Sequence, residues 1–199
     1  MLSVCMKVAL FGGTFDPIHR GHLTAAESVL EFTDCEEVWF VPVYWHVFKT
    51  NTGITDIVHR KKMIGLAIEG KPGIKLVDFN ENPTYTIDTI HKAKNAFPDH
   101  EFVWVIGSNL IDEFPLWKDT SLILAETKII IVPEPGFEKL ESELLSEEKG
   151  TCKILWDAPR VELDSTRVRK KLLASKSVEG LIDSKVINYI KEKGLYRQA

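Results

Sequence analysis

The sequence is poor in cysteine and has no excess of positive charge. Its three cysteines, Cys5, Cys35 and Cys152, lie far apart and form no CxxC pair and no Cys/His cluster. This spacing speaks against a disulfide framework and a structural zinc site, and favours a reducing compartment in which the thiols are small buried apolar groups. The net charge of −4 speaks against a nucleic-acid partner, because faces that bind nucleic acid are basic.

Long hydrophobic runs are also missing. No stretch reaches the roughly 18 uncharged apolar residues of a membrane helix, so we expect no membrane partner. The start, MLSVCMKVALFGG, lacks the apolar run and the cleavage site of a signal peptide. We interpret it as a short leader before a first strand, with Met1 or Met6 as the first residue, and expect a cytoplasmic protein.

What the sequence does contain is a regular alternation of short apolar runs and helical patterns. The apolar runs predict strands at 7–11, 38–41, 74–77, 102–106, 128–132 and 152–155. The helical patterns cover 21–32, 56–69, 86–97, a segment ending at 125, 165–174 and 184–193. Such alternation is typical of βαβ units. It predicts an α/β fold, a Rossmann-like doubly wound parallel sheet with helices on both faces and a C-terminal helical tail.

The same pattern predicts one domain over residues 1–199. We expect its sheet core at about 6–160 and its C-terminal helices at about 164–196. Between them, the acidic stretch 134–150 is expected to be a surface loop with a short helix.

Residues 11–23, FGGTFDPIHRGHL, lead from the first predicted strand into the first predicted helix. Ligands of a parallel sheet bind beyond the carboxyl ends of the strands. There Gly12 and Gly13 let the backbone turn tightly and bring bare N–H groups close to a ligand, and the N-terminus of the helix suits phosphate. Neither GxGxxG nor GxxxxGK(S/T) is present. His19 and His22 face one side of the first helical turn, where they can hold charge that develops on a phosphoryl group.

Taken as a whole, GGTFDPIHRGH resembles the GxFDPxHxGH signature of the nucleotidylyltransferase superfamily. The resemblance implies that this loop and both histidines bind the triphosphate of ATP or CTP and stabilise the transition state. Residues 161–172, VELDSTRVRKKL, resemble the superfamily motif (I/V)SSTx(I/V)R, with Asp164 in place of the first serine. Ser165 and Thr166 can cap a helix whose N-terminus points at phosphate, and the planar guanidinium of Arg169 adds several N–H donors.

Three further segments resemble the bacterial nicotinate mononucleotide adenylyltransferases. Residues 82–89 (NPTYTIDT) are similar to their SYTxDTL segment, 105–110 (VIGSNL) to IIGxDxL, and 114–117 (FPLW) to LPxW. The resemblance implies an enzyme of NAD biosynthesis that transfers AMP from ATP to nicotinate mononucleotide, or to nicotinamide mononucleotide, and releases pyrophosphate. It also implies that Mg²⁺ accompanies ATP, without a metal site of the protein's own.

The resemblance further implies three sets of site residues. The catalytic set is His19, His22 and Arg169. The ATP-binding set is Gly12, Gly13, Thr14, Phe15, His19, His22, Gly107, Asn109, Ser165, Thr166 and Arg169. The set that binds the pyridine nucleotide is Lys49, Tyr85, Thr86 and Trp117.

Four departures from the family pattern leave the acceptor open. The loop 43–52 keeps Lys49 but lacks the family's two prolines and its histidine at the usual place. Asn109 replaces an acidic residue, and Glu134 stands where the family often has arginine. Asp164 adds a carboxylate that is unfavourable beside phosphate unless it caps a helix or helps to hold Mg²⁺. A sibling transferase with another phosphorylated acceptor and a nucleotide-binding sensor without catalysis remain alternatives, and a homo-oligomer remains open.

Overall fold

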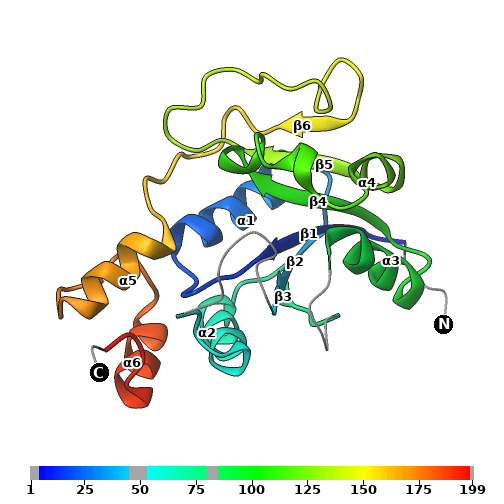
Figure 1. Cartoon of the computed structure of the whole chain (residues 1–199). Coiled ribbons are helices and arrows are strands. Elements are labelled where there is room, and N and C mark those ends of the chain that lie inside the picture. The colour runs from blue at the N-terminus through cyan, green and yellow to red at the C-terminus, as the bar shows by residue number, and fades with distance from the viewer. Residues whose placement is uncertain (1–4, 45–52, 80–84, 198–199) are drawn as a thin grey trace.

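Six parallel strands form the centre of the molecule (Figure 1). The structure is a computed structural model that describes residues 5–44, 53–79 and 85–197. The strands are ordered β3-β2-β1-β4-β5-β6. Their bounds are β1 Lys7–Gly13, β2 Glu37–Pro42, β3 Ile74–Leu76, β4 Glu101–Gly107, β5 Lys128–Val132 and β6 Cys152–Ile154. The strand order changes direction between β1 and β4, the place where doubly wound sheets bind their ligands.

The helices cover both faces of the sheet. They are α1 Arg20–Phe32, α2 Ile57–Ile68, α3 Thr86–Ala96, α4 Thr120–Glu126, α5 Ser165–Leu173 and α6 Ser184–Lys193, with short 3-10 helices η1 Ser108–Leu110 and η2 Phe114–Leu116. Because strand side chains alternate, Val8 and Leu10 of β1 face α3 and α4, whereas Ala9 and Phe11 face α1 and α2. The Rossmann-like α/β fold expected from the sequence is confirmed.

The C-terminal helices extend beyond one end of the sheet (Figure 1). Helix α6 packs on α2, where Tyr189 and Nδ1 of His59 share a hydrogen bond of 2.7 Å and Lys185 pairs with Glu69. Its buried side chains, such as Val186, join the core cluster on the α1 and α2 face. Helix α2 therefore anchors the C-terminal segment of the chain.

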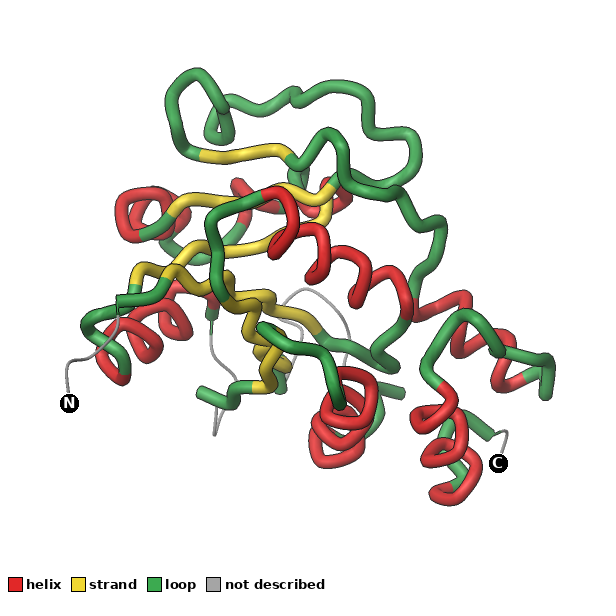
Figure 2. Tube along the Cα trace, turned by 180° about the vertical axis from the view of Figure 1, so that it is seen from behind, coloured by secondary structure: helices red, strands yellow, loops and turns green. Residues whose placement is uncertain are grey.

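Two details differ from the sequence prediction. The loop between β5 and β6 contains turns and bends but no helix (Figure 2), although its Leu145 is buried in the core. Cys5 is exposed, so only Cys35 and Cys152 are the buried thiols expected. Among the described residues, no helix is both long and apolar enough to cross a membrane.

Candidate active site

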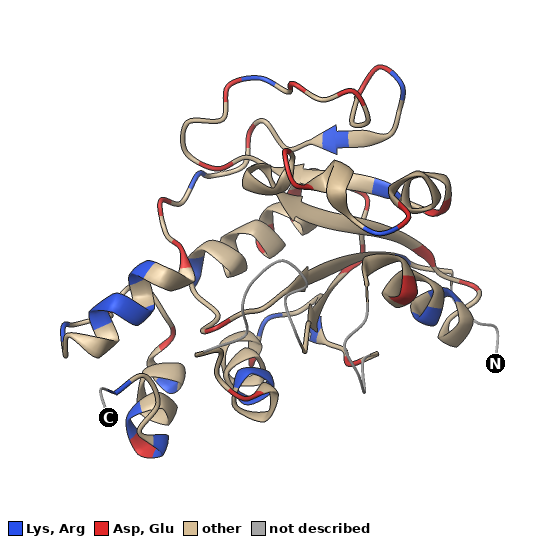
Figure 3. Cartoon of the chain, viewed as in Figure 1, with Lys and Arg blue, Asp and Glu red and all other residues tan. Residues whose placement is uncertain are grey.

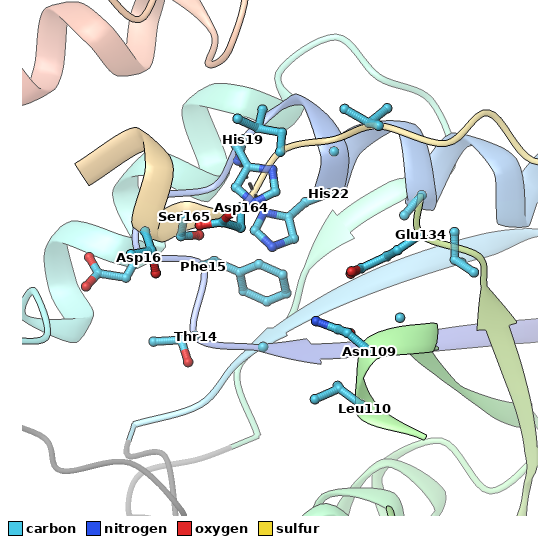
Figure 4. A pocket seen from close by; sticks show the side chains of 18 of the residues that line it. Thr14, Phe15, Asp16, His19, His22, Asn109, Leu110, Glu134, Asp164 and Ser165 are labelled. Atoms are coloured by element: carbon cyan, nitrogen blue, oxygen red, sulfur yellow. Dashed lines mark hydrogen bonds between the residues drawn. The ribbon is translucent and has the colours of Figure 1, made fainter. Parts of the chain in front are cut away.

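A cavity of about 420 Å³ opens at the carboxyl ends of β1, β4 and β5 (Figure 4). Its wall is formed by the loop between β1 and α1, by η1, by the start of the loop after β5 and by residues 159–166. The first turns of α1 and α5 both line it. Free backbone N–H groups and the positive ends of two helix dipoles thus converge on one space, an arrangement that suits an anion.

His19 and His22 form a stacked pair at the start of α1 (Figure 4), with ring centroids 3.6 Å apart. The backbone N–H of His19 donates to Nδ1 of His22 at 3.2 Å, which places the proton of neutral His22 on Nε2. Burial lowers the pKa of His19 to about 4, although the charge of Asp164 opposes this. Burial and the neighbouring His19 lower the pKa of His22 well below its usual range. Both rings are therefore neutral near pH 7.

Helix α5 is joined to the loop after β1 by two side chains. Ser165 Oγ donates to the carbonyl of Pro17 at 3.0 Å, and Arg169 Nη1 donates to the carbonyl of Asp16 at 2.6 Å. Because the Ser165 proton is committed to Pro17, the hydroxyl cannot donate it to a ligand at the same time. The guanidinium of Arg169 has five N–H donors and keeps others for an anion in the cavity.

Asp164, rather than Ser165 or Thr166, caps α5. Its carboxylate accepts from the backbone N–H of Arg167 at 2.8 Å. The sequence prediction that Ser165 and Thr166 cap this helix is therefore wrong, and both lie inside its first turn. The charge of Asp164 adds to desolvation in raising the pKa of Glu134, across the same cavity. Two acidic side chains thus line the cavity beside the N-terminus of α5, a helix that is otherwise rich in lysine and arginine (Figure 3).

The glycines of the site provide room for neighbouring side chains. A Cβ on Gly12 would lie 2.4 Å from the Trp104 ring, and a Cβ on Gly13 would lie 2.7 Å from the Phe15 ring. A Cβ on Gly107 would lie 2.7 Å from Oδ1 of Asn109. Gly12 and Gly13 belong to β1, so packing space rather than a tight turn explains them. The expected tight turn at Gly12 and Gly13 is therefore wrong, whereas the approach of their N–H groups to a ligand stays a prediction.

Comparison with known proteins identifies the family. A model described as cytidylyltransferase-like matches residues 10–171. The nicotinate-nucleotide adenylyltransferase of Bacillus subtilis (strain 168) is 36% identical over 96% of this chain and 98% of its own length. The probable nicotinate-nucleotide adenylyltransferase of Bacillus licheniformis is 34% identical over the same shares. The chain belongs to the nicotinate-nucleotide adenylyltransferase family.

A solved structure supports the fold assignment of this family member. The Plasmodium falciparum nicotinic acid mononucleotide adenylyltransferase complexed with NaAD superposes with a TM-score of 0.78. The match covers 96% of this chain and 97% of that one, at 21% sequence identity. At this identity the likeness concerns the fold, and it confirms that the family's sheet and C-terminal helix are present here.

The residues expected to bind ATP come together in this family member. All of them line the cavity: Gly12, Gly13, Thr14, Phe15, His19, His22, Gly107, Asn109, Ser165, Thr166 and Arg169. They come from three parts of the chain that the parallel sheet brings to one edge. Their individual roles remain predictions, but the prediction that they share one site agrees with the geometry.

The residues expected to bind the pyridine nucleotide are arranged differently. Tyr85, Thr86 and Trp117 belong to the start of α3 and the end of η2, and they are absent from the described lining of the cavity. The two segments meet, because Nζ of Lys118 lies 4.5 Å from the centroid of the Tyr85 ring. Trp117 is partly buried and packs against the core beside Phe114. Lys49 lies outside the described residues.

Three residues at and near the cavity were missed from the sequence: Asp16, which lines it, and Arg60 and Tyr196, which are absent from its described lining. Asp16 stands inside the quoted loop motif but received no role, and its carboxylate is 3% exposed. Arg60 is 1% exposed in the first turn of α2, on the same helical face as Met63 and Ala67. Tyr196 follows α6, and its hydroxyl donates a hydrogen bond to Asp16, 180 residues earlier in the sequence. A local sequence pattern cannot predict such a contact.

The acidic side chains of the cavity fit a metal that arrives with its ligand. In the described part of the chain no three His, Cys, Asp or Glu residues are grouped as metal ligands. Asp16, Glu134 and Asp164 are the carboxylates that line the cavity, and the carboxylate of Asp16 already accepts from Tyr196 and from the backbone N–H of Thr55. Mg²⁺ bound to nucleotide phosphates keeps several waters and needs few protein ligands.

Proposed function

We propose that this chain transfers AMP from MgATP to the 5′-phosphate of nicotinate mononucleotide, giving the dinucleotide of NAD biosynthesis and pyrophosphate. The observation that carries the proposal is the convergence of the neutral His19–His22 pair and Arg169 on one cavity with two helix N-termini. The names of relatives at 33–36% identity support the choice of acceptor.

The proposed reaction is an in-line displacement. A phosphate oxygen of the acceptor forms a bond to the α-phosphorus of ATP, and the bond from that phosphorus to the bridging oxygen of pyrophosphate breaks. The pyrophosphate carries away the electron pair, so no proton transfer and no protein nucleophile are needed. Positioning of the two substrates and stabilisation of the developing negative charge provide the rate enhancement.

The proposed roles follow from the donors present. The Nε2–H of His22 and backbone N–H groups of the loop at Phe15 donate to phosphate oxygens near the reacting centre. Arg169 and the first turn of α5 hold the outer phosphates, with the backbone N–H of Ser165 in place of its committed hydroxyl. Because both histidines are neutral, they direct donors at the phosphates without adding positive charge.

The acceptor is proposed to bind between the start of α3 and the end of η2. Trp117 provides a flat apolar surface for the pyridine ring, and Tyr85 and Thr86 provide backbone polar groups beside it. Lys49 is proposed to steer the acceptor phosphate. Mg²⁺ enters as part of the substrate and neutralises phosphate charge. The free thiols suit a reducing compartment, so the reaction is proposed to take place in the cytoplasm.

Pyrophosphate release with separate acceptors tests this function. The purified chain is given MgATP with nicotinate mononucleotide, nicotinamide mononucleotide or phosphopantetheine. We expect release with a pyridine mononucleotide, fastest with nicotinate mononucleotide. Release with phosphopantetheine alone would identify a sibling transferase. ATP binding without release from any acceptor would favour the non-catalytic sensor.

A further inference from the structure

Arg60 of α2 is buried and bound to four backbone carbonyls. Its Nε donates to Thr55 at 2.9 Å, its Nη1 to Thr14 at 2.7 Å and Val43 at 2.8 Å, and its Nη2 to Tyr44 at 3.3 Å. These acceptors lie in the loops after β1 and β2 and in the segment before α2. Burying a guanidinium among neutral acceptors is expensive compared with an apolar side chain. This free-energy cost has a reason if holding these loops in one position serves the function of the neighbouring cavity.

The carbonyl of Thr14 belongs to the wall of the nucleotide cavity. In a trans peptide the C=O and the following N–H point in opposite directions. Thr14 and Phe15 line the cavity, whereas Arg60 is buried behind them. By holding the Thr14 carbonyl from behind, Arg60 directs the N–H of Phe15 towards the cavity. Phe15 has a φ of +49°, a left-handed conformation that a residue other than glycine keeps only when its surroundings hold it.

The next residue of the loop is held by the C-terminal segment. Tyr196 donates its hydroxyl proton to Oδ1 of Asp16 at 2.5 Å, and Oδ2 accepts from the backbone N–H of Thr55 at 3.2 Å. The Asp16 carboxylate points away from the two histidines (Figure 4). Tyr196 also has a left-handed backbone, with a φ of +56°. The hydrogen bond from its hydroxyl to Asp16 helps to hold this strained backbone conformation.

Thr55 connects the two halves of this arrangement. Its carbonyl accepts from Arg60 while its N–H donates to Asp16. Burial lowers the pKa of Arg60, and the nearby charge of Asp16 opposes this. The contacts from Tyr196 through Asp16, Thr55 and Arg60 to the Thr14 carbonyl form one continuous frame, in which Asp16 and Arg60 are buried and Thr14 and Asp16 line the cavity. We call these five residues the loop frame.

We propose that Arg60 and Tyr196 are positioning residues for AMP transfer, and that through the loop frame they keep the Phe15 N–H aimed at the phosphates of the bound nucleotide. This inference rests on the proposed function. It makes the end of the chain part of the active-site scaffold, although Tyr196 lies outside the cavity. Because the Phe15 N–H matters most where negative charge develops, loss of the frame lowers kcat more than it raises the KM for ATP.

Kinetics of Tyr196→Phe and Arg60→Lys test the inference. Arg60→Lys keeps the charge but loses the planar set of donors. We expect kcat to fall about tenfold in Tyr196→Phe and about a hundredfold in Arg60→Lys, with the KM for ATP changed less than about threefold. The matched control is Tyr189→Phe, which removes a tyrosine hydroxyl from the same segment but from a bond to His59 of α2. It should lower the melting temperature as Tyr196→Phe does and leave kcat unchanged.

Wild-type kcat in folded Tyr196→Phe would overturn the inference, and so would an equal loss of kcat in Tyr189→Phe. If Arg60→Lys does not fold, the kcat of Tyr196→Phe alone decides whether the inference holds. The wild-type assay judges the proposed function separately, because pyrophosphate release by the wild type stands whatever the variants do.

A spectrum of the chain labelled with ¹⁵N-phenylalanine tests the loop frame without turnover. The Phe15 amide signal is assigned by its absence from a Phe15→Leu sample. MgATP should shift this signal in the wild type and in Tyr189→Phe, and shift it less in Tyr196→Phe at saturating nucleotide. No shift in the wild type, or an equal shift in Tyr196→Phe, would overturn the inference even if no acceptor supports turnover.

Discussion

The imidazole rings of His19 and His22 stack at the start of α1, with centroids 3.6 Å apart and 23° between their planes. The pair is held by the N–H of His19, which donates to Nδ1 of His22. Protonation of either ring would place a positive charge against its partner in a buried site. The arrangement of the pair therefore favours neutral rings that donate hydrogen bonds. The neutral state affects both the pH dependence of stability and the rate of the reaction.

The free energy of unfolding should decrease in mild acid because of His19. Its pKa of about 4 in the folded chain lies below the value of about 6.5 in the unfolded chain. Between these values the unfolded chain binds more protons, so the stabilising contribution is complete above about pH 6.5 and is lost as the pH falls towards 4. Urea unfolding at about pH 7.5 and 5 should show that wild type loses about 2 kcal/mol more than His19→Gln. Equal losses would contradict the neutral assignment of His19.

Removing the ring of His22 should affect turnover far more than folding. His22→Ala deletes an Nε2–H donor from the cavity, and loss of one such donor costs about a hundredfold or more in kcat. His91→Ala, on α3, serves as the matched control. Pyrophosphate release and thermal unfolding are measured together. A His22→Ala chain that is fully active, or that is unfolded, would contradict the catalytic assignment.

Replacing Asp164 by serine should improve ATP binding. Serine is also a good N-cap, so α5 keeps its start while the cavity loses a negative charge. We expect the KM for ATP to fall by about two- to fivefold, with a larger effect at low ionic strength. Asp183→Ser, at the N-cap of α6, tests the capping change alone. A higher KM or a large loss of kcat in Asp164→Ser would mean that the carboxylate takes part in the reaction.

Two glycine substitutions should change stability in opposite directions. A Cβ on Gly12 would lie 2.4 Å from the buried Trp104 ring, and such overpacking costs about 1–3 kcal/mol. Gly65 lies inside α2, and a Cβ there meets no described atom within 4 Å. Gly65→Ala should therefore stabilise the chain by about 0.5–1 kcal/mol. Urea unfolding measures both, and a stabilising Gly12→Ala would contradict the packing explanation.

The fold was predictable because its signals are local. Short apolar runs marked the strands to within two residues at each end, and Asp183 and Gly194 set the limits of α6. The histidine pair was predictable for the same reason, because a spacing of three residues on one helix determines which side chains meet. That α5 shares a site with the first loop was expected only from the family resemblance, which assigns Ser165, Thr166 and Arg169 to the ATP site.

The remaining features depend on contacts that no local pattern contains. Arg60 shares a helical face with Met63 and Ala67, but no local pattern shows that two loops, after β1 and after β2, supply the carbonyl acceptors for its guanidinium. Tyr196 meets Asp16 because α6 packs on α2, which aims the end of the chain at the first loop. The expected caps Ser165 and Thr166 were wrong because Asp164, one residue earlier, has the stronger acceptor. The expected helix in 134–150 was inferred from charge, which does not by itself specify a helix.

Transfer of label from ATP tests the central claim most directly. The chain is given nicotinate mononucleotide and MgATP labelled with ³²P at the α-phosphorus, and the products are separated. We expect the label to appear in the dinucleotide, in equal amount to the pyrophosphate released. Label that stays in ATP, or appears only as free AMP, would contradict the assignment of this chain as an adenylyltransferase for a pyridine mononucleotide.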